Sequence, residues 1–132
     1  MKILVFVCME DKTQSYFDTE TGIFYKIYFG EISFEDLVAS WEKVIEEKLI
    51  PENVKKFLIN YKQAIILFPP RFAIDIANFY KRHDDIFGQS KIAMVMETPD
   101  QVVFPRLVED ENVNFKTHTF YTLEAAVEWL ME

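Results

Sequence analysis

Cysteine is almost absent from the sequence, because Cys8 is the only one. A single thiol can form no intrachain disulfide, and it cannot supply the paired thiolates of a structural zinc site. The low cysteine content predicts a cytoplasmic protein. Cys8 also lies within the apolar run of residues 3–9, where we expect a buried and unreactive thiol.

Glycine and long apolar segments are scarce as well. Three glycines in 132 residues leave no glycine-rich loop to cradle a phosphate, and no Gly-x-Ser-x-Gly nucleophile elbow occurs. No stretch approaches the roughly 20 apolar residues that cross a bilayer, so no integral membrane segment is expected. Charged residues 10–12 follow the first apolar run where a signal peptide would need small residues, and we interpret that run as a strand.

Basic residues are outnumbered by acidic ones. The chain has 14 Lys and Arg against 22 Asp and Glu, a formal charge of -8, so the positive charge typical of a nucleic-acid-binding protein is missing. Apolar content is high, since 50% of the residues are hydrophobic and 16% are aromatic. This composition excludes a disordered tail or linker and predicts one folded domain over residues 1–132.

The order of predicted elements indicates an α/β fold. An N-terminal antiparallel hairpin followed by alternating helices and strands favours a single open, mixed, mostly parallel sheet with right-handed crossovers. We expect about five strands and about four helices, with residues 3–9 as either the first strand or an addition. The predicted strands are residues 3–9, 16–17, 23–29, 55–60, 91–96 and 115–120, and helices are predicted after the cap Ser33, from Pro70 towards Gly88, after Thr98 and after Thr122.

Alternation within residues 23–29 separates two faces of that strand. Gly30 is expected to end it. One face carries Ile23, Tyr25, Ile27 and Phe29, and the other carries Phe24, Lys26 and Tyr28. In the last helix, we expect Leu123, Ala126, Val127 and Leu130 to be buried.

Four segments carry a resemblance to a known group of domains. The most specific is FYTLEAAVEWL at residues 120–130, and the others are GEIS at 30–33, FLIN at 57–60 and KIAMV at 91–95. Together they resemble the STAS/SEC14-like group of small bacterial domains, which includes the anti-sigma-factor antagonists of the SpoIIAA type. The resemblance covers roughly residue 15 to the C-terminus, and it implies a SpoIIAA-like fold with a regulatory or protein-interaction role.

One departure from the antagonists bears directly on regulation. The antagonists carry a phosphorylatable Ser in the loop after the central strand, whereas no Ser or Thr occurs here from Trp41 to Gln89. Without a hydroxyl, the charge of a phosphoserine cannot act as the switch at that site. We therefore expect a STAS-like module without Ser-phosphorylation switching at the usual loop.

The two histidines, His83 and His118, are the candidates for a catalytic or metal-binding site. His83, Asp84 and Asp85 are consecutive, and side chains at adjacent helix positions do not face one site. His118 falls in a different element. We interpret His83 as a cation near a helix end, and predict no catalytic residue, no metal site and no cofactor.

The candidate functional segment is residues 61–71. It leaves the carboxyl end of a central parallel strand, where ligands of open α/β folds bind, and residues 64–68 are five consecutive apolar residues outside any predicted element. Three interpretations stay open: a surface for a protein partner or a second copy, one wall of a pocket for a small apolar ligand or lipid, or a lid over the core. The candidate surface comprises Tyr61, Lys62, Gln63, Ile65, Ile66, Phe68 and Arg71.

Overall fold

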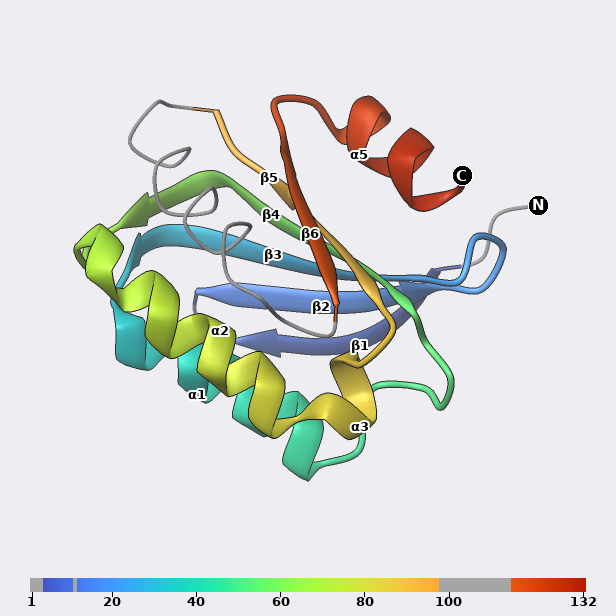
Figure 1. The fold of residues 1–132 in the computed structure, drawn as a ribbon, viewed down its shortest axis with the longest axis horizontal. Coiled ribbons are helices and arrows are strands. Elements are labelled where there is room, and N and C mark those ends of the chain that lie inside the picture. Colours follow the sequence, from blue (N-terminus) through green and yellow to red (C-terminus); the bar gives the residue numbers. More distant parts are fainter. Residues whose placement is uncertain (1–3, 11, 98–114) are drawn as a thin grey trace.

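A six-stranded mixed sheet forms the centre of the computed structural model, which describes residues 4–10, 12–97 and 115–132 (Figure 1). The strands lie in sequence order across the sheet. The first two pairings are antiparallel and the remaining three are parallel. The strands are β1 (Leu4–Glu10), β2 (Thr13–Asp18), β3 (Ile23–Ile32), β4 (Lys56–Ile66), β5 (Lys91–Val95) and β6 (Lys116–Phe120). The predicted mixed sheet with an N-terminal antiparallel part is confirmed, with six strands.

Helices pack on both faces of the sheet. The larger apolar core lies between the sheet and α1 (Phe34–Glu46), α2 (Ala73–Arg82) and α3 (Asp84–Phe87), and the smaller core lies under α5 (Leu123–Leu130). Figure 1 shows α5 apart from the α1 and α2 layer. The helix predicted from Pro70 towards Gly88 is divided into the 3-10 turn η1 (Pro70–Phe72), α2 and α3. The helix predicted after Thr98 lies outside the described residues.

Aromatic rings fill the larger core. The Trp41 indole packs edge-on against the rings of Phe57, Tyr80 and Phe87, at centroid distances of 6.2, 6.2 and 5.2 Å. Such edge-to-face pairs add to the stability that burial provides. The high aromatic content is therefore largely accounted for by packing, as the composition of a folded domain predicts.

Both ends of α1 have hydrogen-bonded caps. The Ser33 hydroxyl accepts from the Asp36 N–H and the Asp36 carboxylate accepts from the Ser33 N–H, each at 3.0 Å, which is a capping box. At the other end, the Lys48 N–H donates to the Ile45 carbonyl and the Leu49 N–H to the Val44 carbonyl. This pattern is a Schellman motif, in which Lys48 takes the left-handed position with a φ of 55°.

Three predicted details were wrong. β2 begins at Thr13, so the first arm of the hairpin is longer than residues 16–17. β3 continues through Gly30, whose φ of 69° bends the chain without ending the strand. Leu123 is 39% exposed because it is the first residue of α5, next to the capping Thr122, whereas Ala126 and Leu130 are buried as expected.

Candidate functional site

The candidate segment is largely strand rather than loop, so its predicted conformation was wrong. β4 continues to Ile66, and residues 64, 65 and 66 pair with residues 30, 31 and 32 of β3. The Leu67 N–H still donates to the Ile32 carbonyl at 2.9 Å. β5 pairs with β4 only as far as Asn60. The ends of β3 and β4 therefore extend together beyond β5.

Three of the seven candidate residues point into the core. The Tyr61 ring is buried and stacks on the Tyr28 ring at a centroid distance of 5.5 Å. Phe68 is also buried, with its ring 5.8 Å from that of Phe34, and Ile66 packs against the same core. The lid interpretation thus describes these three side chains in part, although β4 carries Tyr61 and Ile66, and Phe68 lies just beyond its end.

Alternate residues at the end of the same strand and directly after it point outward. Ile65 and Leu67 are 59% and 54% exposed, and Gln63 is exposed beside them. Ile74, in the first turn of α2, is 55% exposed. We call Ile65, Leu67 and Ile74 the β4 tip. Sequence reasoning did not include Leu67 or Ile74, although Ile74 falls outside the apolar stripe of its helix and could have been recognised.

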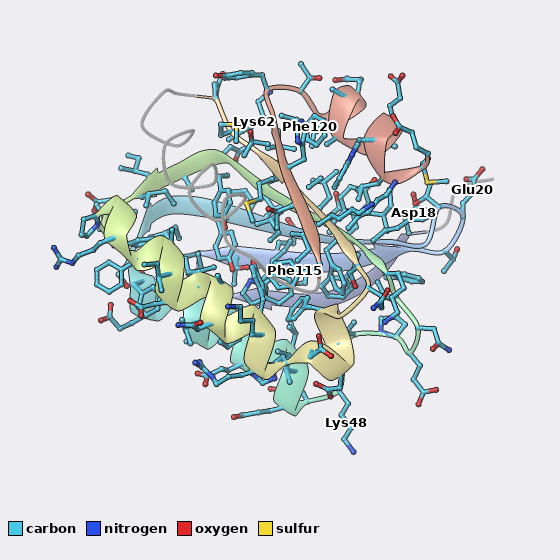
Figure 2. All side chains as sticks on the ribbon, viewed as in Figure 1. Asp18, Glu20, Lys48, Lys62, Phe115 and Phe120 are labelled. Atoms are coloured by element: carbon cyan, nitrogen blue, oxygen red, sulfur yellow. The ribbon has the colours of Figure 1, made fainter. Side chains whose placement is uncertain are left out.

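The polar candidates surround this end of the sheet. The Lys62 N–H donates to the Asn60 side-chain carbonyl at 2.9 Å, and the Lys62 side chain is half-buried. The exposed Arg71 guanidinium lies 5.4 Å from the centre of the Phe72 ring. Figure 2 shows Lys62 and Phe120 of β6 towards the same end of the molecule, as expected for the carboxyl ends of parallel strands.

A buried lysine lies beneath α1, and sequence reasoning gave it no role. Lys26 is 1% exposed, and its ammonium donates to the Ser15 hydroxyl at 3.2 Å and to the Ser40 carbonyl at 3.3 Å. The ammonium also lies 5.0 Å from the centre of the Trp41 ring, a cation–π distance. The signal was present, since the alternation of residues 23–29 placed Lys26 on the same face as Phe24 and Tyr28.

Buried hydroxyl groups surround this lysine. The Tyr28 hydroxyl lies 2.7 Å from the Ser40 hydroxyl, which donates its own proton to the Leu37 carbonyl at 2.8 Å. Tyr28 must therefore be the donor of the pair. Burial is the main cause that raises the pKa values of Tyr28, Tyr61 and Tyr80 above the usual value.

Two cavities lie away from the candidate segment. One of about 250 Å³ is lined by Thr13, Tyr28 and Ser40, and the Lys12–Asp36 ion pair of 3.2 Å is at its rim. The other, of about 600 Å³, lies between the end of α1, the segment of residues 50–55 before β4, and α3. Neither is lined by any of the seven candidate residues, so these two cavities give no support to a pocket wall at residues 61–71.

The two histidines are not brought together. The His83 ring packs 4.8 Å from the Phe79 ring of α2, whereas the His118 ring lies 5.7 Å from that of Trp129 in α5. Across the described part of the chain, no three His, Cys, Asp or Glu side chains are grouped as metal ligands would be. The same residues contain no helix with the length and apolarity needed to cross a membrane.

Comparison with known proteins identifies the fold. No family model matches the chain, and no curated protein matches it. The structure is similar to the crystal structure of an uncharacterised protein of the DUF3478 family with a SpoIIAA-like fold from Shewanella loihica PV-4. The two sequences are 15% identical, the match covers 98% of this chain and 95% of the other, and the TM-score is 0.57. The fold is therefore SpoIIAA-like, which confirms the predicted fold class.

Proposed function

We propose that this protein is a non-enzymatic, cytoplasmic regulatory or protein-interaction module of the STAS-like type. The observation that carries the proposal is the β4 tip, where Ile65 and Leu67 are more than half exposed at the carboxyl end of a central strand. Single exposed aliphatic side chains are common and need no explanation. Three exposed aliphatic side chains, two at the end of β4 and one in the first turn of α2, support an interaction surface.

The position of the β4 tip favours a rigid binding surface. The outward Ile65 alternates with Ala64 and Ile66, which pack towards the core. The Ile65 side chain is thus held by a paired strand and its buried neighbours. A surface that is ordered before binding loses less conformational entropy when a partner docks.

Serine phosphorylation does not control this surface in the proposed function. No Ser or Thr lies between Trp41 and Gln89, and this interval contains the whole β4 tip. The two tyrosines of the interval, Tyr61 and Tyr80, are buried. Partner binding at the β4 tip would then depend on the apolar contact itself rather than on added charge.

Affinity capture with matched variants tests the proposal. Ile65→Asp and Leu67→Asp each place a charge on the β4 tip, and Met131→Asp makes the same kind of change at a residue that is 46% exposed at the other end of the chain. We expect wild type and Met131→Asp to retain a common set of stoichiometric partners and the two tip variants to lose it, with thermal melting unchanged. Retention of the full set by both tip variants would contradict the proposal.

A second candidate function is the binding of a small apolar ligand or lipid. It is favoured by the cavity of about 600 Å³ next to α1 and α3. Val44, Ile50, Val54 and Ile86 are among the apolar residues that line it, and its volume is within the usual range for ligand sites. Native mass spectrometry of gently purified protein would then show a retained ligand. A clean apo mass together with no thermal shift across a lipid panel would reject this candidate.

A further inference from the structure

The smaller of the two cavities, of about 250 Å³, lies between α1 and the strands β2 and β3. We call it the α1 cavity. Its rim consists of exposed or half-buried residues, whereas its floor consists of buried ones. The rim residues are Lys12, Asp36 and Ala39, and the floor residues are Thr13, Tyr28, Ile32 and Ser40. The cavity therefore leads from the surface to buried polar groups beneath α1.

The Thr13 hydroxyl is a buried polar group without a hydrogen-bond partner among the described residues. Thr13 is 6% exposed and lies opposite Tyr28 in the β2–β3 pairing, so both side chains are on the face of the sheet that α1 covers. A buried hydroxyl without a partner is unfavourable, and nearly all such groups in folded proteins are paired. A ligand in the α1 cavity can supply the partner that Thr13 does not find within the described chain.

The other polar groups of the cavity have hydrogen-bonding capacity left over. The Lys12 ammonium donates one of its three protons to Asp36 Oδ2 at 3.2 Å. Asp36 accepts this bond and the bond from the Ser33 N–H on the same oxygen, so its Oδ1 is left to accept from a ligand. The Tyr28 hydroxyl gives its proton to Ser40 and can still accept. The cavity thus offers a mixture of donors and acceptors.

We propose that the α1 cavity binds a small neutral polyol, whose hydroxyl groups donate to Asp36 and Tyr28 and accept from Lys12 and Thr13. Each hydroxyl of a polyol both donates and accepts, which matches the mixed set of groups. One water molecule takes about 30 Å³ of the liquid, so the cavity has room for about eight non-hydrogen atoms of this size. This volume suits a polyol of about four carbons, with its carbon chain against the apolar Ile32 side chain.

The charges at the rim disfavour an ionic ligand. An anion that approaches Lys12 also approaches Asp36, and a cation meets the same conflict in reverse, because the two side chains lie 3.2 Å apart. A zwitterion would have to separate this ion pair in order to bind both charges, whereas hydroxyl groups can bond to both while the pair stays intact. The site is independent of the β4 tip and of the larger cavity, with which it shares no lining residue.

NMR titration of the nitrogen-labelled full chain with erythritol tests the proposal. We expect saturable shifts confined to the residues that line the α1 cavity, with a dissociation constant in the millimolar range because a ligand of about eight non-hydrogen atoms makes few contacts. Thr13→Val keeps the shape of the side chain and removes the hydroxyl, so it should weaken binding by about three- to tenfold. Thr117→Val makes the same change on β6 and should bind as the wild type does.

A second pair of variants tests the space rather than the hydrogen bond. Ala39→Leu fills part of the rim and should weaken binding, whereas Ala125→Leu makes the same change at an exposed position of α5 and should not. Thermal melting of each variant confirms that it is folded.

Probes of similar size test the class of ligand. Free serine, acetate and methylammonium are zwitterionic, anionic and cationic, and each should bind more weakly than erythritol. The absence of any saturable shift with erythritol would overturn the proposal and leave the Thr13 hydroxyl to water. Unchanged affinity in both Thr13→Val and Ala39→Leu, or tighter binding of any charged probe, would overturn it as well.

Discussion

Lys26 shows how a cation is accommodated within an aromatic core. Its ammonium has hydrogen bonds to Ser15 and to the Ser40 carbonyl, and the Trp41 face lies within cation–π range. A buried charge without such partners would cost several kcal/mol. The same Ser40 also accepts from Tyr28, so the residues around Lys26 depend on one another for their hydrogen bonds.

This dependence can be measured with a double-mutant cycle on Tyr28 and Ser40. Tyr28→Phe leaves one acceptor site on Ser40 empty, and Ser40→Ala leaves the buried Tyr28 hydroxyl without its partner, so each should lower the free energy of unfolding by about 1–2 kcal/mol. The double variant should lose less than the sum of the two, with a coupling of about 0.5–1 kcal/mol. Urea unfolding followed by circular dichroism gives all four values. Strict additivity would show that the 2.7 Å contact does not stabilise the fold.

At the scale of elements, the backbone conformation of one residue at the C-terminal end of α1 lowers the stability of the fold. Lys48 occupies the left-handed position of the Schellman motif with a φ of 55°, where glycine is favoured because it has no Cβ. We expect Lys48→Gly to raise the free energy of unfolding by about 1 kcal/mol. Lys48→Ala removes the same charge but keeps a Cβ, and it should change stability by less than about 0.5 kcal/mol. Equal gains in the two variants would contradict a backbone origin.

The elements that sequence predicted best have strong local signals. Ser33 and Thr122 mark helix starts, and their side chains accept the expected backbone hydrogen bonds. The end of β4 has no such signal, because residues 64–68 are uniformly apolar and show no alternation. Its conformation depends on β3, which continues past Gly30 to Ile32 and provides the missing partner. A strand fixed by long-range pairing cannot be delimited from its own residues.

The candidate surface was predicted in position but not in detail. The segment does lie at the carboxyl end of β4, yet Tyr61 and Phe68 are buried while Ile65 is exposed. Which residues of an apolar run point outward depends on the register of the strand, since a shift by one residue exchanges its two faces. Sequence analysis had no register for residues 61–68, so it could not separate core residues from surface residues.

At the scale of the whole molecule, the larger core contains three fully buried tyrosines that oppose ionisation. Tyr28, Tyr61 and Tyr80 come from β3, β4 and α2, and burial raises the pKa of each above the usual value of about 10. Below pH 10, the tyrosines are protonated in both the folded and the unfolded chain, so they do not make the free energy of unfolding depend on pH. Above it, the unfolded chain releases three protons that the folded chain retains. The stability of the whole domain therefore falls as pH rises.

Alkaline unfolding measures this coupling. With three tyrosines, the free energy of unfolding should fall by about 4 kcal/mol per pH unit above pH 10. Tyr80→Phe should reduce that slope by about a third, because it removes one of the three buried hydroxyl groups. The part of the tyrosinate absorbance that comes from these three rings should appear together with the change in circular dichroism, since the buried rings ionise only when the core opens. Reversible ionisation of these tyrosines while circular dichroism stays native would show that solvent reaches the core without unfolding.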